Sequence, residues 1–98
     1  MNNIHNIDWF KAEIIPLLNN YEIQYRFYEE GDFGSLNQIT FESKEKGGNI
    51  DFWGLDWLGI FIWDYQKEKE LLNILLEPNQ ELEKEKAFDK LQTLLIEK

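Results

Sequence analysis

Few side chains in this sequence are reactive enough to do chemistry. There is one histidine, His5, and no cysteine, so a histidine cluster, a thiolate nucleophile and a cysteine-based metal site are all missing. We expect His5 to be an exposed residue of the N-terminus, which leaves Ser35 and Ser43 without an obvious general base. The sequence therefore argues against nucleophilic catalysis.

Clustered carboxylates are the remaining catalytic possibility. Glu29, Glu30 and Asp32 lie close together, and such acids can hold a divalent metal or hydrolyse glycosides. Gly31 stands among them, but the ligand pattern of a calcium-binding loop is absent. A chain this short also has little material for a deep cleft. We therefore predict a binding protein rather than an enzyme, without catalytic residues, metal or cofactor.

Aromatic side chains give a stronger signal of function. A strand over residues 57–65 would point its aliphatic residues to one side and its aromatic residues to the other, namely Leu58, Ile60 and Ile62 against Trp57, Phe61, Trp63 and Tyr65. If the aliphatic side faces the helices, the opposite sheet face carries an aromatic row, with Asp51 and Trp53 beside it. Aromatic residues among acids are typical of a protein-binding hot spot. The alternative is that a helix covers the row, which would then be ordinary core.

The elements that position these residues follow from the hydrophobic period. Apolar residues at three- and four-residue spacings over residues 7–21 predict a helix with Asp8 as its N-cap and a break near Ile15, because Pro16 lies inside it. A period of two then predicts strands over residues 21–29, 36–43, 49–53 and 57–65. Gly47 and Gly48 are expected to form a tight hairpin. Short strands joined by hairpins indicate an antiparallel sheet.

The C-terminal third contains one ambiguous segment. In residues 66–76 the composition favours helix, but the alternation of Leu72, Ile74 and Leu76 fits a fifth strand almost as well. A last helix is expected from Glu81 to Ile96 after an N-cap at Asn79, burying Leu82, Phe88, Leu91, Leu94 and Leu95. The predicted fold class is α+β, with a four- to five-stranded antiparallel sheet flanked by an N-terminal and a C-terminal helix.

Length and composition limit the class of protein. The 98 residues form one domain, 1–98, and 43% hydrophobic and 15% aromatic residues are enough for a folded core. The sequence lacks cysteine, a start typical of a signal peptide, and any apolar run near the roughly 20 residues that span a bilayer. We expect a cytoplasmic protein.

The charge is unevenly distributed along the chain. The net charge is −9, which disfavours direct binding to nucleic acid or to an anionic membrane and favours a basic protein, although acidity can also serve solubility alone. Residues 22–64 have nine acidic and three basic residues, a net −6, whereas residues 65–98 have eight and six, a net −2. The excess thus belongs to the sheet. The predicted partner-binding residues are Glu29, Glu30, Asp32, Asp51, Trp53, Asp56, Trp57, Trp63 and Asp64.

The segment from Gly47 to Tyr65 reads GGNIDFWGLDWLGIFIWDY. A short chain with this acidic, tryptophan-rich sheet between two helices resembles the bacterial immunity proteins of contact-dependent growth-inhibition and other polymorphic toxin systems. The resemblance implies a cytoplasmic inhibitor that binds and neutralises one cognate toxin domain, commonly a nuclease. These families share no common motif, so no residue role is carried over. Two other functions stay open: a carbohydrate-binding module using exposed Trp and Tyr, and a nucleic-acid-mimicking regulatory subunit of a basic protein.

Overall fold

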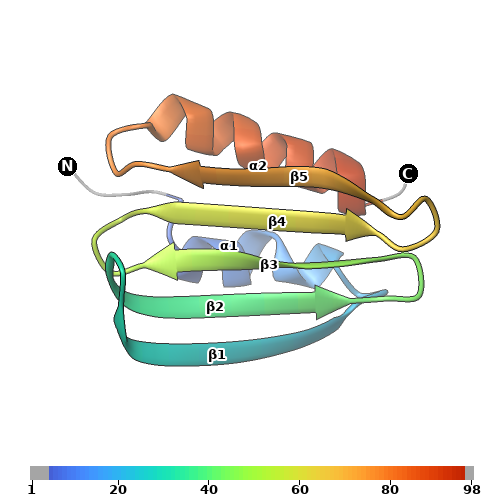
Figure 1. Ribbon diagram of the computed structural model, residues 1–98, viewed down its shortest axis with the longest axis horizontal. Helices are drawn as coiled ribbons and strands as arrows, with labels where there is room; N and C mark the ends of the chain where they lie inside the picture. Colours follow the sequence, from blue (N-terminus) through green and yellow to red (C-terminus); the bar gives the residue numbers. More distant parts are fainter. Residues whose placement is uncertain (1–4, 97–98) are drawn as a thin grey trace.

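The computed structural model describes residues 5–96 and has an α+β fold (Figure 1). Its elements are α1 (Ile7–Glu13), the 3-10 helix η1 (Ile15–Leu17), β1 (Glu22–Gly31), β2 (Gly34–Glu42), β3 (Lys46–Trp53), β4 (Leu58–Asp64), β5 (Lys69–Leu76) and α2 (Glu81–Leu95). The strands form one sheet in the order β1-β2-β3-β4-β5, and every neighbouring pair is antiparallel. The predicted fold class is confirmed.

The fifth strand resolves the ambiguity over residues 66–76. Its three alternating aliphatic residues lie opposite three aliphatic residues of β4, in the pairs Leu72–Ile62, Ile74–Ile60 and Leu76–Leu58. All six pack in the core, so joining the sheet buries apolar surface. This tertiary gain outweighs the helix propensity of the segment.

Proline breaks the first helix, as predicted. The α-helix ends at Glu13, and Pro16 lies at the start of η1, where a missing N–H costs nothing. The predicted N-cap is wrong by two residues: the side chain of Asn6, not Asp8, accepts a hydrogen bond from the backbone N–H of Trp9 at 2.9 Å. The N-cap of α2 is likewise Gln80 rather than Asn79.

The hairpin predicted at Gly47 and Gly48 is wrong, because both glycines lie inside β3. The turn comes earlier, where the hydroxyl of Ser43 accepts the backbone N–H of Lys46 at 3.1 Å. A Cβ on Gly48 would collide with the backbone carbonyl of Phe61 on β4. These glycines mark a close approach within the sheet and not a turn.

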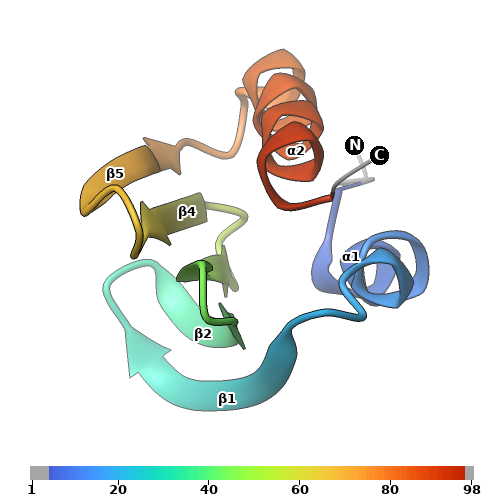
Figure 2. The same cartoon turned by 90° about the vertical axis from the view of Figure 1, so that its right-hand side faces the viewer.

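The core lies between the sheet and the two helices, which are on the same side of the sheet (Figure 2). The rings of Phe10 from α1 and Phe88 from α2 meet there, with centroids 5.8 Å apart, and Ile60 at the centre of the sheet is 1% exposed. Leu82, predicted to be buried, is 58% exposed. The stripe of α2 that faces the sheet comprises Lys84, Ala87, Phe88, Leu91 and Leu95, and Leu82 falls outside its phase.

Lys84 is fully buried in that stripe. Its Nζ donates hydrogen bonds to the backbone carbonyls of Asp56 at 2.8 Å and Pro78 at 3.2 Å, and to the carboxylate of Glu81 at 3.3 Å. These three acceptors satisfy the three donors of the ammonium group. Lys84 thereby connects the start of α2 to the turn between β3 and β4.

Within residues 5–96, no helix has the length and apolar character needed to cross a membrane.

Candidate binding face of the sheet

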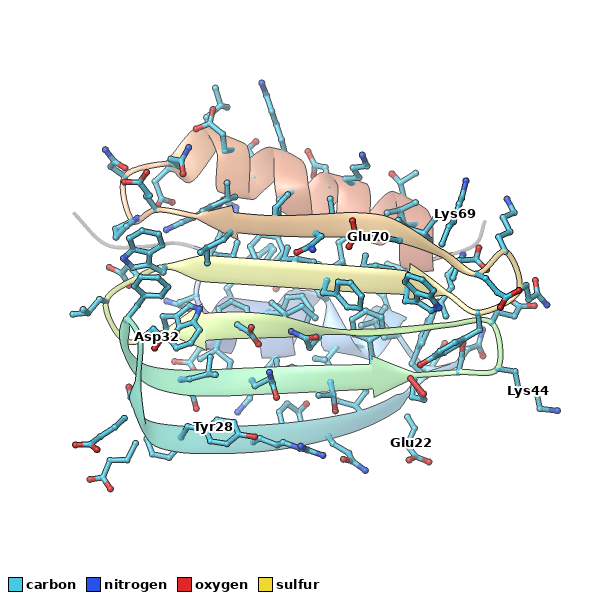
Figure 3. All side chains as sticks on the ribbon, viewed as in Figure 1. Glu22, Tyr28, Asp32, Lys44, Lys69 and Glu70 are labelled. Atoms are coloured by element: carbon cyan, nitrogen blue, oxygen red, sulfur yellow. The ribbon has the colours of Figure 1, made fainter. Side chains whose placement is uncertain are left out.

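One face of the sheet carries no helix, and Figure 3 looks directly onto it. Ile50 and Ile60 pair across β3 and β4 and point into the core, so the neighbouring pair, Asn49 and Phe61, points away. We call this side the open face. Its side chains are those of Glu22, Gln24, Arg26, Tyr28, Leu36, Gln38, Thr40, Glu42, Asn49, Asp51, Trp53, Phe61, Trp63, Glu70, Asn73 and Leu75. Phe61 and Trp63 share a face, as the alternation of β4 predicted, and of the two alternatives left open by the sequence the structure has the uncovered one.

A hollow of about 570 Å³ lies on the open face over β1 to β4. Its lining consists of Glu22, Gln24, Arg26, Thr40, Phe41, Glu42, Gly47, Gly48, Asn49, Phe61, Trp63 and Tyr65. The rings of Phe61 and Trp63 form one wall. They lie nearly parallel, with 6.5 Å between centroids and 19° between planes. The opposite wall is polar and comes from β1 and β2. The two glycines of β3 form the floor, and the absence of side chains there leaves the hollow open.

Carboxylates stand at one end of the hollow. The hydroxyl of Tyr65 donates to both oxygens of the Glu42 carboxylate, at 2.7 and 2.8 Å. This hydrogen bond is the main reason that the pKa of Tyr65 lies above its ordinary 10.0; desolvation and the negative charge of Glu42 act in the same direction. Glu22 lies directly opposite Glu42 in the β1–β2 register. Because facing like charges are unfavourable in a sheet, this end of the hollow favours a cation.

An aromatic cluster closes the other end of the open face. Phe33, from the turn between β1 and β2, stacks on Trp57 with centroids 4.0 Å apart and meets Trp53 edge-on at 5.3 Å. Trp53 also lies against Gly31, where a Cβ would come within 2.6 Å of its ring. Trp53 and Trp57, both predicted partner-binding residues, are therefore half-buried and hold two turns together. Phe33 lies between two of the predicted strands, residues 21–29 and 36–43, and nothing in its spacing identifies its aromatic partners.

The predicted acidic residues fall in different places. Glu29, Glu30 and Asp32 are exposed at the end of the β1–β2 hairpin, where Figure 3 shows Asp32. Asp56 is exposed in the turn between β3 and β4, with a positive φ of 70°. The structure brings the first three together on one turn, and Asp56 lies on the neighbouring turn, where the backbone N–H of Leu55 donates to the carbonyl of Phe33 at 3.0 Å.

Asp51 lies on the open face, half-buried between polar neighbours. Its Oδ1 accepts hydrogen bonds from Nε2 of Gln38 at 2.9 Å and from Nδ2 of Asn49 at 3.1 Å. These two amides come from β2 and β3, and they hold the carboxylate in position. Asp51 lies on the same sheet face as Trp53, as predicted.

Asp64 does not belong to this face. It is 6% exposed, and its Oδ1 accepts the backbone N–H groups of Gln66 at 2.9 Å and Lys67 at 3.0 Å, which closes the turn after β4. The hydrogen bond from Lys67 is the main cause of a pKa of Asp64 below its ordinary 3.8, against an opposing contribution from desolvation. Since the carboxylate is engaged within the chain, we remove Asp64 from the candidate partner-binding residues.

The expectation of an exposed His5 is wrong. Its ring contacts Trp9 edge-on at 4.9 Å and lies 5.7 Å from the ring of Phe88, so the N-terminal end of the described chain packs onto both helices. Among residues 5–96, no group of three or more His, Asp or Glu side chains is arranged to hold a metal ion.

No family model, curated protein or solved structure matches this chain. The class of protein is therefore defined by its fold and by the site: an α+β protein whose five-stranded sheet has both helices on one face and an open hollow on the other. Function has to be argued from that hollow and from the charges around it.

Proposed function

We propose that this chain is a binding protein that recognises a basic protein through the open face, and that its partner is a bacterial toxin domain which it neutralises. The observation that carries the proposal is the hollow on an uncovered sheet face, with an aromatic wall and two facing carboxylates at one end. The resemblance to immunity proteins supplies the nature of the partner.

The extent of the open face supports a protein rather than a small molecule as partner. Apolar side chains stay exposed well outside the hollow: Leu75 on β5 is 51% exposed and Tyr28 on β1 is 43% exposed. Together with Phe61 and Trp63 they spread from one edge strand to the other. Large apolar residues that remain exposed over such a span are typical of protein interaction surfaces.

Charge supports a basic partner. The open face contains four acids, Glu22, Glu42, Asp51 and Glu70, and one base, Arg26, and the acids of the β1–β2 hairpin stand at its end. A cation entering the hollow would relieve the repulsion between Glu22 and Glu42 and could rest against the ring of Trp63. An arginine or lysine side chain of a partner has this chemistry.

Growth protection tests the proposal directly. Each reading frame next to the gene for this chain is expressed in a bacterial host, alone and together with the chain. We expect one product to stop growth and the chain to restore it. The proposal is overturned if no neighbouring product is toxic or if the chain fails to protect against the toxic one.

A matched pair of variants connects protection to the open face. Trp63→Ala removes half of the aromatic wall, and we expect it to lose protection, since anchors in a desolvated pocket contribute about 2 kcal/mol or more. Leu82→Ala shortens an apolar residue that is 58% exposed on α2, and it should protect as the unchanged chain does. Equal protection by the two folded variants would place the interface elsewhere.

Carbohydrate binding is the second candidate, and one observation favours it. The near-parallel rings of Phe61 and Trp63 face Gln24, Thr40 and Asn49 across the hollow, and sugar recognition uses such aromatic platforms beside polar groups. Titration with soluble oligosaccharides, followed by tryptophan fluorescence, separates the two functions. We expect no saturable change. Saturable binding that Trp63→Ala abolishes would replace the protein-binding proposal with a carbohydrate-binding one.

A further inference from the structure

The outer edge of β1 is an unpaired strand edge. β1 is the longest strand, with ten residues, and stands first in the strand order, so within the described chain only β2 pairs with it. Figure 1 shows no element beyond β1, whereas α2 contacts the other edge strand, β5. The free edge therefore presents a row of backbone N–H and C=O groups to its surroundings.

This edge lacks most of the features that protect natural sheet edges from pairing. From Glu22 to Tyr28 its register with β2 is continuous, and the single irregularity follows Tyr28 near the hairpin turn. The strand EIQYRFYEEG contains no proline and no lysine, and Arg26 is its one base. Pairing would be hindered by a bulge, a proline or a central lysine. The regular part of β1 is thus a competent template for another strand.

Exposed aromatic residues stand on both sides of that template. Tyr25 is 52% and Phe27 61% exposed on the side of the helices, and Tyr28 is 43% exposed on the open face. Lys11 of α1 approaches the ring of Tyr25 at 4.9 Å, but the ring stays half-exposed. An added strand would cover these rings with its own alternating side chains.

Charge decides between a second copy of this chain and a different partner. Acids stand at both ends of β1, Glu22 at the start and Glu29 and Glu30 near the end. An antiparallel pair of β1 strands centred on Tyr25 and Arg26 would set Glu22 of each copy near Glu29 of the other, between two chains of net charge −9. Such facing like charges are unfavourable. The edge instead complements a strand with basic residues at both ends.

We propose that the edge of β1 is a docking site for an extended segment of a basic protein, which adds to the sheet as a sixth strand. The segment has apolar residues opposite Tyr25 and Phe27 and lysine or arginine at its ends. The inference rests on the proposed function for the nature of the partner, and it adds a backbone-paired contact next to the hollow. Backbone hydrogen bonds give affinity to such strand addition, and side-chain pockets and charges give specificity.

Synthetic peptides test the site on the purified chain. The probe alternates valine with threonine and has two lysines at each end; one control carries glutamates instead, and another is N-methylated at every residue of the valine–threonine segment, so that neither of its edges can donate hydrogen bonds to β1. We expect the lysine peptide to bind at least about tenfold more tightly than either control and to slow amide exchange in β1. Equal affinity of the lysine and glutamate peptides, or of the lysine and N-methylated peptides, overturns the proposal.

Variants of the chain complete the test. The double change Tyr25→Ser with Phe27→Ser removes apolar contacts without altering charge, and we expect peptide affinity to fall by about tenfold; Leu82→Ser on α2 is the control. A dimer in sedimentation experiments that the double change dissociates would show that a second copy occupies the edge and would overturn the proposal. Growth protection separates the two hypotheses: loss with Trp63→Ala but not with the double change leaves the open face valid and refutes the edge.

Discussion

Lys84 shows how far the surroundings of one residue can alter its role. In a helix of mixed charge a lysine is ordinarily solvated, and the sequence pattern places Leu82 inside. In the structure Lys84 is buried and Leu82 is exposed, because the stripe of α2 that faces the sheet includes Lys84. Two backbone carbonyls from loops lie there and accept hydrogen bonds from its ammonium group. Those carbonyls belong to Asp56, between β3 and β4, and to Pro78, between β5 and α2, and no local sequence pattern predicts that they meet at Lys84.

Replacing Lys84 by Met should destabilise the protein by about 3–6 kcal/mol. The change keeps the length of the side chain but leaves the carbonyls of Asp56 and Pro78 without their donor, and hydrogen bonds to charged groups contribute about 1.5–3 kcal/mol each. Urea unfolding measures the difference. The control, Lys86→Met, lies at an exposed position of the same helix and should stay within about 0.5 kcal/mol of the unchanged chain. Similar losses for both variants would mean that Lys84 is not buried.

Asp64 should make the stability depend on pH at acid values. Its pKa is lower in the folded chain than the ordinary 3.8, so in the acid range the unfolded state binds more protons and stability rises with pH. The contribution is complete well above pH 3.8 and is lost as pH falls through the folded pKa. Asp64→Asn keeps an acceptor for the turn but does not titrate, so its urea midpoint should fall less between pH 7 and about pH 3. Asp89→Asn, on the exposed side of α2, should fall as the unchanged chain does; an equal fall for Asp64→Asn would contradict the assignment.

At the scale of elements, the sequence predicts the strands whose apolar and polar residues alternate. For β4 it also predicts which residues share each face. A period of two determines which residues share a side, so the sequence predicts that Leu58, Ile60 and Ile62 lie together. It leaves open which side the helices cover, and the structure places these three residues in the core. The sequence predicts a hairpin at Gly47 and Gly48, which lie inside β3, because a turn and a close approach between strands both require glycine. Residues 66–76 were ambiguous because local propensity favours helix and only pairing with β4 favours strand.

Ile60→Ala should destabilise the fold by about 2–5 kcal/mol, the usual range for truncating a buried aliphatic residue. Ile60 is 1% exposed and pairs with Ile50 on β3 and Ile74 on β5, so the cavity would lie at the centre of the sheet. Leu75→Ala, 51% exposed on the open face, is the control and should cost less than about 1 kcal/mol. Thermal and urea unfolding of both variants check the assignment. An equal loss of stability from Leu75→Ala would mean that the assignment of the buried and the open face of the sheet is wrong.

At the scale of the whole molecule, much of the negative charge lies on one side, at the open face and the hairpin beside it. The sequence places the acidic excess in residues 22–64, and the structure locates much of it on the open face and on the β1–β2 hairpin at its end. The hollow itself could not be predicted from the sequence. It needs Gly47 to lie beneath the contact between Tyr65 and Glu42. That arrangement depends on the register of β2, β3 and β4. The free edge of β1 depends on strand order, which the alternation of single strands does not determine.

Association with the partner identified by growth protection should therefore be steered by the acids of the sheet. Reversing Glu22 and Glu30 to Lys removes negative charge at the two ends of β1, and we expect association to slow by about tenfold at low salt and to lose much of its salt dependence. Asp51 is unsuitable for this test, because its carboxylate holds Gln38 and Asn49 in place.

Reversing Glu83 and Glu85 to Lys is the control, since it makes the same change of charge at exposed positions of α2. Rate constants for both pairs are measured at about 0.05 M and 0.5 M salt, where screening lengths differ about threefold. Steering acts before contact, so the sheet reversals should change the association rate more than the dissociation rate. The helix reversals lie on α2, on the side of the sheet away from the open face, and they should change both rates little. If the helix reversals slow association most, the partner approaches the helices, and the open face is not where it binds.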